Sequence, residues 1–201
     1  APSNLVVGYH RESGFLGAKI KAEDAKQDLE VHCSELDRLL LIFNSGLYTV
    51  VNVSDKLFIG NELAWLGVVQ NNLVFNLIYR NGTENTSYVK RFRTPKFILN
   101  REYRLFPEHK RSVIQFLEMG ERAVRARVSL VPSARARYNS LDVNMDDYLI
   151  KSPGSIGKRL NSRVVRRIVS ATGKPVAPPA AAPILPGFIP GEGQNGSETG
   201  D

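Results

Sequence analysis

The segment that decides the fold lies at residues 39–51, which read LLLIFNSGLYTVV. A run of five apolar residues precedes a short turn with a glycine at position 46, and a second run rich in β-branched and aromatic residues follows it. Two such runs around a glycine-containing turn are typical of an antiparallel hairpin, since glycine readily adopts the positive φ angles of tight turns. The segment therefore predicts two paired strands, 39–43 and 47–51.

Similar units recur along the chain. The recurrences are residues 73–79 and 87–92 around a loop at Asn81-Gly82, residues 113–117 and 124–128 around a turn at Met119-Gly120, and residues 148–151 followed by Pro153-Gly154 and the short runs 164–165 and 168–169. The glycines at 14, 46, 82, 120 and 154 are 32, 36, 38 and 34 residues apart. Repeated β units of this size stack or arrange radially, because each alone exposes an apolar face. We therefore expect an all-β fold, a propeller-like or barrel-like array of repeated hairpins over residues 1–171.

The last thirty residues have a different composition. Residues 172–201 are rich in proline, alanine and glycine, and they carry too few apolar side chains to offset the entropy of ordering. We expect a disordered tail without a function of its own. The chain begins Ala-Pro-Ser and has methionine only at positions 119 and 145, so we expect a processed product or a piece of a longer protein.

Composition and cysteine content indicate where in the cell the protein is expected. The chain has 201 residues, of which 42% are hydrophobic and 23% charged, as in ordinary globular proteins. Cys33 is the single cysteine, so no intramolecular disulfide is possible. No export signal precedes the repeats, and no apolar run is long enough to span a bilayer. We expect a cytoplasmic protein that does not contact the membrane.

The basic residues are concentrated in the second half of the repeat region. Residues 86–170 hold nineteen Lys and Arg against seven Asp and Glu, whereas residues 1–85 hold seven against ten. Clustered cations focus a positive potential and release counterions from a phosphate backbone. This distribution makes nucleic acid the first partner to consider.

One segment shows how these cations could be displayed. Val124, Ala126 and Val128 alternate with Arg125 and Arg127, which in a strand places the apolar side chains on one face and the guanidiniums on the other. The residues that we predict to contact phosphate are Lys90, Arg91, Arg93, Lys96, Arg101, Arg104, Lys110, Arg111, Arg125, Arg127, Arg135, Arg137, Lys158, Arg159, Arg163, Arg166 and Arg167. Zinc-finger spacing, a recognition helix and an aromatic RNA-binding signature are all missing, so we expect binding that depends strongly on salt and weakly on sequence.

Enzymatic and metal chemistry find little support in the sequence. His32 and Cys33 with His10 or His109 match no standard zinc spacing. Neither paired carboxylates nor a positioned nucleophile nor a phosphate-cradling glycine loop can be recognised. We expect a chain that is not catalytic alone and carries no cofactor and no metal.

Taken together, the repeats resemble the C-terminal DNA-wrapping domain of the A subunit of bacterial type IIA topoisomerases, the gyrase and topoisomerase IV family. The resemblance spans roughly residues 7–169 and rests on residues 34–43 with the Gly46 turn, 75–82, 88–92, and 148–151 leading to 157–159. It implies a β-pinwheel, a propeller-like disc whose basic rim bends double-stranded DNA and presents it to the cleavage core. The rim would be formed by the cations in 88–92, 124–128 and 157–167.

The resemblance also implies a parent enzyme and its partners. That enzyme would be an ATP-dependent type II DNA topoisomerase, associated with the nucleoid in the bacterial cytoplasm, and the chain would work with its cleavage core and ATPase subunit. Residues 13–19 and 155–159 are poor matches to the glutamine-, arginine- and glycine-rich box of gyrase, so the chain is more similar to topoisomerase IV. Because the repeat region is shorter than a complete gyrase disc, we expect fewer blades or an open ring.

Three hypotheses follow from these observations. The first is a non-catalytic domain that binds and bends duplex DNA for strand passage by a type IIA topoisomerase. The alternative is a propeller-like protein-interaction module whose basic surface docks an acidic protein or RNA. An independent enzyme is the least supported, and Arg137-Tyr138, which is similar to the Arg-Tyr pair at the family's catalytic tyrosine, lies in what we expect to be a connecting loop.

Overall fold

The structure is a computed structural model that describes residues 4–174. Within these residues it has sixteen β-strands, one short 3-10 helix (η1, Met145–Asp147) and no α-helix, which confirms the predicted all-β class. No helix in this part of the chain is long and apolar enough to cross a membrane. The predicted tail spans residues 172–201, and its part from residue 175 onward lies outside the described residues.

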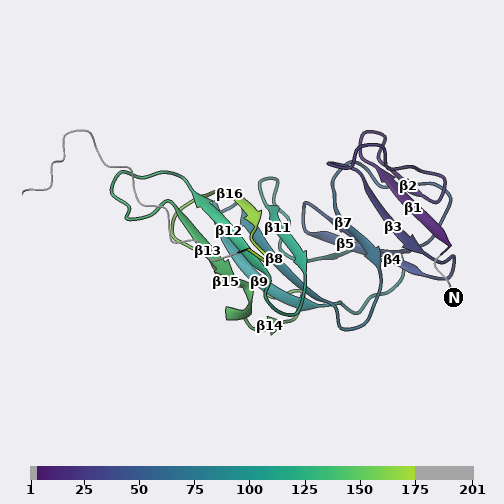
Figure 1. Cartoon of the computed structure of the whole chain (residues 1–201). Helices are drawn as coiled ribbons and strands as arrows, with labels where there is room; N and C mark the ends of the chain where they lie inside the picture. The colour runs from purple at the N-terminus through teal and green to yellow at the C-terminus, as the bar shows by residue number, and fades with distance from the viewer. Residues whose placement is uncertain (1–3, 175–201) are drawn as a thin grey trace, which may run out of the picture.

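The strands form four sheets that follow one another along the chain (Figure 1). The first sheet has the order β3 (Leu29–Cys33), β1 (Leu5–His10), β2 (Phe15–Gly17) and β6 (Leu57–Phe58). The second is β10 (Tyr103–Arg104), β5 (Leu47–Asn52), β4 (Arg38–Phe43) and β7 (Leu63–Val68). The third is β11 (Val113–Met119), β8 (Val74–Asn81) and β9 (Thr86–Arg93), with β14 (Ile150–Lys151) and β15 (Lys158–Arg159) both on β9. The fourth is β13 (Ser140–Asn144), β12 (Arg125–Leu130) and β16 (Val165–Ser170).

One topological rule generates all four sheets. Each sheet is built on a hairpin (β1–β2, β4–β5, β8–β9 or β12–β13), and a later strand (β3, β7, β11 or β16) returns to pair with the hairpin's first strand. After each of the last three hairpins the chain first goes back to the preceding sheet and adds a short strand to it. These exchanged strands are β6, β10, and the pair β14 and β15. Neighbouring sheets are thus linked by strand exchange.

The cores lie between consecutive sheets. Tyr9 and Leu16 of the first sheet pack with Leu39 and Leu41 of the second, and Leu40 and Ile42 on the second sheet join a cluster with Phe75 and Phe92 of the third. Ile78 and Val89, on the opposite face of the third sheet, pack against Val128 of the fourth. Both faces of the two middle sheets are therefore covered, which explains the run of consecutive apolar residues in β4.

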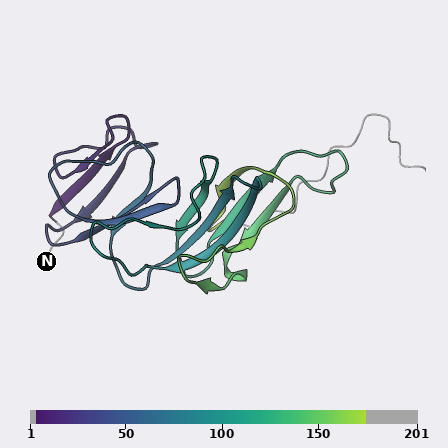
Figure 2. The ribbon, with the colours of Figure 1, turned by 180° about the vertical axis from the view of Figure 1, so that it is seen from behind.

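The sheets form an open row. The first and the fourth sheet lie at opposite ends of the molecule in both views (Figures 1 and 2), in agreement with the expected open ring. The returning strands β3, β7, β11 and β16 contact one another in series along the row. The exchanged strands occupy the opposite side of their sheets, which we call the exchanged edge.

Two of the predicted hairpins are wrong. Residues 113–117 and 124–128 do form strands, but β11 pairs with β8 in the third sheet and β12 pairs with β13 and β16 in the fourth. Likewise β14 belongs to the third sheet and β16 to the fourth. Gly120 therefore lies in the connection between the third and the fourth sheet, and Gly154 lies between β14 and β15, which both pair with β9, whereas Gly14, Gly46 and Gly82 do lie between the paired strands of hairpins. Turn composition alone cannot distinguish a hairpin from a crossing between sheets.

Candidate nucleic-acid interface

Lys90 is buried, with 3% of its surface exposed. Its Nζ donates to three backbone carbonyls, those of Leu105, Pro153 and Ser155, the last at 2.7 Å. Leu105 directly follows β10, and the other two carbonyls lie between β14 and β15, so one ammonium group holds together the exchanged edges of two sheets. Burial lowers the pKa of Lys90 to about 8.

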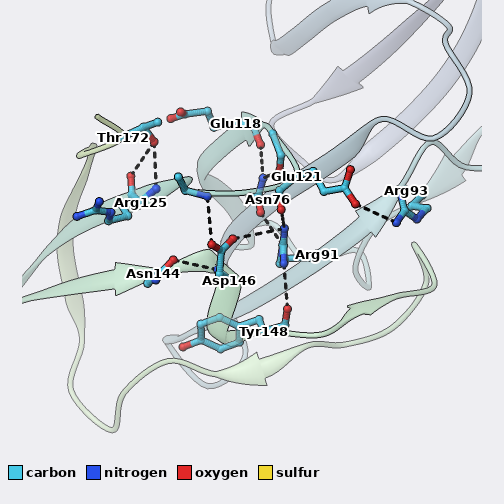
Figure 3. Close-up of polar contacts among 12 residues, drawn as sticks. Asn76, Arg91, Arg93, Glu118, Glu121, Arg125, Asn144, Asp146, Tyr148 and Thr172 are labelled. Atoms are coloured by element: carbon cyan, nitrogen blue, oxygen red, sulfur yellow. Dashed lines mark hydrogen bonds and ion pairs between the residues drawn. The ribbon is translucent and has the colours of Figure 1, made fainter. Parts of the chain in front are cut away.

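Arg91 is buried on the opposite face of the same strand, where it joins the third sheet to the fourth (Figure 3). Its guanidinium donates to Asn76 Oδ1 at 2.8 Å, to the Tyr148 carbonyl at 3.2 Å and to the Glu121 carbonyl. Its Nη2 also lies 3.9 Å from a carboxylate oxygen of Asp146. The donors of Arg91 are thus used by the protein itself.

Asn76 completes this network. Its amide donates to the Glu118 carbonyl at 3.0 Å, near the end of β11 (Figure 3), and to the Gly120 carbonyl at 2.8 Å, in the connection between β11 and β12. A buried polar network with satisfied partners fixes one arrangement of the groups around it. Lys90 and Arg91 therefore stabilise the junctions between sheets, and we correct the prediction that they contact phosphate at a rim.

Four further predicted cations are half-buried and bonded to the protein. Arg104 donates to the carbonyls of Ser45 and Phe106, and Arg163 to those of Val131 and Tyr138. Arg127 forms a two-pronged pair with Asp142 at 2.8 and 3.0 Å, which raises its pKa. Arg125 donates to the Lys174 carbonyl at 3.3 Å. Arg125 and Arg127 do lie opposite the buried Val124, Ala126 and Val128, as predicted from the alternation.

The remaining predicted cations are exposed. They are Arg93, Lys96, Arg101, Lys110, Arg111, Arg135, Arg137, Lys158, Arg159, Arg166 and Arg167. Among residues 4–174, the cations of the 86–170 region form ion pairs at three places, Arg91–Asp146, Arg93–Glu121 and Arg127–Asp142. Most of the exposed positive charge is therefore not neutralised by a neighbouring carboxylate.

Five of the exposed cations lie on strands of the third and fourth sheets, and the other six lie in the connections between strands. Lys158 and Arg159 form β15 on the exchanged edge of the third sheet, and Arg101 lies two residues before β10, on the exchanged edge of the second. Arg166 and Arg167 lie on β16, on the other side of the fourth sheet. The sequence prediction omitted Lys151 on β14, which is exposed next to β15 on the same edge. Lys151 belongs to segment 148–151, on which the resemblance to the topoisomerase domain partly rests, and this was a reason to add it to the predicted cations.

The residues at which the sequence raised metal or nucleophilic chemistry are Cys33, the histidines and Tyr138. Cys33 is buried, and burial raises the pKa of its thiol. No three His, Cys, Asp or Glu side chains within residues 4–174 are grouped as metal ligands. Tyr138 lies in the connection between β12 and β13, where its carbonyl accepts from Arg163, as expected for a connecting loop.

The chain is similar in sequence to one known protein and in fold to a solved structure. The A subunit of DNA topoisomerase 4 from Borreliella burgdorferi is 27% identical over 176 residues, which are 84% of this chain and 25% of that protein. The chain therefore spans a quarter of the length of this relative. The crystal structure of the C-terminal domain of DNA topoisomerase IV has a similar fold, with a TM-score of 0.53 and 11% identity over 84% of this chain and 62% of that one.

The chain is also similar to a second solved structure and matches a family model. The C-terminal domain of DNA gyrase A aligns with a TM-score of 0.47 and 14% identity over 83% of this chain and 64% of that one. The family model described as the topoisomerase C-terminal domain of Bacteroidota matches residues 7–172, which include every described strand except the first two residues of β1. The chain therefore belongs to the topoisomerase C-terminal domain family.

Proposed function

We propose that this chain binds and bends a segment of duplex DNA and presents it to the cleavage core of a type IIA topoisomerase for strand passage. The chain contributes no catalytic group. The core and the ATPase subunit of the parent enzyme supply the chemistry, on the nucleoid in the bacterial cytoplasm. The family of the chain supports this role, and the named relative is the A subunit of a DNA topoisomerase 4.

The observation that carries the proposal is the exposed positive charge on the third and fourth sheets and on the connections between strands. Eleven of the seventeen predicted cations are exposed, and of these only Arg93 has a carboxylate partner among residues 4–174. Cations that lack such partners can neutralise phosphates and release counterions, which gives affinity without sequence readout. A surface with this chemistry suits a DNA segment that differs in sequence at each encounter.

The open row of sheets supports bending. Exposed cations lie close to β10, on β15 and on β16, and therefore at three successive sheets of the row. Deforming a site of 20–30 base pairs costs on the order of 1–6 kcal/mol, which additional phosphate contacts can offset. A duplex that curves along the row gains these contacts.

A fluorescence transfer experiment tests this function. A duplex of 20 base pairs, about 68 Å long at 3.4 Å per base pair, carries a donor at one end and an acceptor at the other, and saturating protein should increase the transfer efficiency because the ends approach each other. Binding without any change in transfer contradicts bending. Poly-glutamate and single-stranded RNA serve as competitors, and displacement of DNA by either of them at equal charge concentration would favour a docking module for acidic protein or RNA.

A further inference from the structure

An open groove of about 520 Å³ lies between the first and the second sheet, beside the exchanged strand β6. Phe58 on β6, with 65% of its surface exposed, lines the groove from the first sheet. The residues that line it from the second sheet share the face turned towards the first sheet, and they are Leu41, Phe43, Leu47, Thr49 and Val51. The groove therefore exposes apolar surface between two sheets that pack together elsewhere.

The connection that crosses this junction is shorter than its counterparts. Ten residues, 53–62, follow the β4–β5 hairpin, whereas nineteen residues, 94–112, follow β8–β9 and twenty, 145–164, follow β12–β13. The connection 94–112 contributes five large apolar side chains to the core between the second and the third sheet, namely Phe97, Leu99, Tyr103, Leu105 and Phe106. The shorter one contributes Val53 and Ile59 to the first junction. The groove is the space that a longer connection fills in the next junction.

Phe43 marks the place that is left open. The second and the third sheet can be compared residue by residue, because Leu41 and Leu77 both face the preceding sheet and the isoleucines after them both face the following one. Phe43 then corresponds to Tyr79, whose ring is stacked on Phe106 with the centroids 4.3 Å apart. Within residues 4–174, no ring is stacked on Phe43 in this way.

Phe58 has the position in the first junction that Phe106 has in the second. Each ring covers the hairpin turn of the earlier sheet, since a Cβ at Gly14 would lie 2.8 Å from the Phe58 ring and a Cβ at Gly46 would lie 2.6 Å from the Phe106 ring. Phe106 is nevertheless 3% exposed, and Phe58 is largely exposed. Phe43 and Phe58 line the same groove, so a large apolar side chain that enters it would lie against both rings.

The charge of the groove is negative. Glu62 and Glu102 line it, both are exposed, and neither is ion-paired within residues 4–174. No lysine or arginine is found among the described residues that line it. Thr49 takes the register position on β5 that Lys90 takes on β9, so this junction has a hydroxyl where the next one has an ammonium group. The groove therefore repels a phosphate backbone and attracts a cationic side chain.

We propose that this groove docks an extended segment of a partner protein that carries a large apolar side chain and, close to it, a lysine or an arginine. The apolar side chain enters between Phe43 and Phe58, and the cation lies near Glu62 and Glu102. Such a segment supplies to the first junction what residues 94–112 supply to the second. The inference goes beyond the proposed function and does not depend on DNA binding.

A fluorescein-labelled peptide with the sequence of residues 94–106 is the probe. This sequence fills the equivalent space in the second junction, and it carries three cations and one carboxylate. In fluorescence anisotropy it should bind the whole chain saturably below about 1 mM. A peptide with alanine in place of both phenylalanines should bind roughly tenfold more weakly, and so should one with glutamine in place of its three cations. Absence of saturable binding to the wild type overturns the proposal.

Phe58→Ala locates the apolar part of the site. We expect it to weaken peptide binding roughly tenfold, because the inserted side chain loses one of the two rings that it contacts. Leu36→Ala is the matched control, since Leu36 is 88% exposed and lies outside the groove, and it should bind the peptide like the wild type. Equal affinity of the wild type and Phe58→Ala contradicts the proposal.

The carboxylates are tested separately, because their exposed side chains can be changed with little risk to the fold. Glu62→Gln with Glu102→Gln should weaken peptide binding roughly fivefold, as two exposed ion pairs are lost. Glu30→Gln with Glu35→Gln removes the same charge from exposed positions on and after β3, outside the groove, and should have little effect. Equal losses in the two double variants would show that the groove does not select the cation.

Two other occupants give different results. If a second copy of the chain covers the groove, the wild type sediments as a dimer and Phe58→Ala as a monomer, and the proposal is wrong. Phe58→Ala should bind a labelled 20-base-pair duplex like the wild type, so a loss of DNA affinity in the folded variant would assign the groove to DNA and overturn the proposal. A wild type that binds the peptide but no duplex refutes the proposed function and leaves the docking groove in place.

Discussion

Lys90 and Arg91 are neighbours on β9, yet their side chains leave the third sheet on opposite faces and tie it to different sheets. Lys90 reaches carbonyls beside β10 and in the β14–β15 loop, and Arg91 reaches the β11–β12 connection and η1. Alternation along a strand makes this possible, because consecutive side chains point to opposite faces. Two adjacent cations thus fix both junctions of the same sheet.

Lys90→Met should lower the free energy of unfolding by about 2–4 kcal/mol, because one buried and two partly buried carbonyls lose their donor at once. Lys96→Met, at an exposed position, is the matched control and should change stability by less than about 0.5 kcal/mol. Urea denaturation followed by far-UV circular dichroism measures both. Equal stability of the two variants would show that Lys90 does not hold the exchanged edges together.

Gly46→Ala tests the hairpin turn on which the fold was predicted. Gly46 has a φ of +86°, and a Cβ there would lie 2.6 Å from the ring of Phe106. Phe106 follows the exchanged strand β10, so the substitution strains the turn and displaces the ring that covers it. We expect a loss of about 2 kcal/mol or more in thermal denaturation. Gly154→Ala, which meets no atom within 4 Å and lacks a positive φ, should be nearly neutral.

Acid should weaken the first sheet through Asp28. Its carboxylate accepts from the backbone N–H groups of Arg11, Glu23 and Asp24, and these bonds lower its pKa from 3.8 to about 2. Because the folded pKa lies below the unfolded one, this stabilisation is complete above about pH 4 and is lost as the pH falls towards 2. The stability difference between the wild type and Asp28→Asn should therefore shrink over that interval. A difference that is constant from pH 5 to pH 2 would contradict this role.

The exposed edge of the third sheet should determine part of the salt dependence of DNA binding. Lys158→Gln with Arg159→Gln should weaken binding and reduce the slope of log K against log salt by about 2, if each side chain contacts one phosphate. The control is Lys21→Gln with Lys26→Gln, which removes the same charge from exposed positions beside the first sheet. Titrations of a labelled duplex at several salt concentrations give both slopes. Equal losses in the two double variants would indicate that only net charge matters.

Local pattern predicted the strands well and their partners less well. The hairpin at 39–51 and that at 73–92 were predicted because their pairing is local and their turns contain glycine. The pairing of β11, β14 and β16 could not be predicted, because each of them joins a strand that is distant in sequence. The strand exchange depends on how whole sheets pack against each other, so it cannot be predicted from the residues of a short segment.

The sequence predicted which region of the chain is basic, but it did not predict which of its cations are exposed. Charge counting identified the region correctly as basic, and eleven of its seventeen assigned cations are exposed. Lys90 and Arg91 were assigned wrongly to the exposed surface. The sequence around a lysine or arginine in a strand does not show whether backbone carbonyls from distant segments will accept hydrogen bonds from it. Their flanks, Val89 and Phe92, are apolar on both sides and were the available warning.

The central claim is that the row of sheets bends duplex DNA along its exposed cations, and the affinity for linear duplexes of increasing length at several salt concentrations tests it most directly. We expect the affinity to rise with length until the duplex can follow the whole row. We also expect log K to fall with log salt at a slope that implies on the order of 5–10 phosphate contacts. Weak binding that is independent of duplex length and of salt would contradict the account.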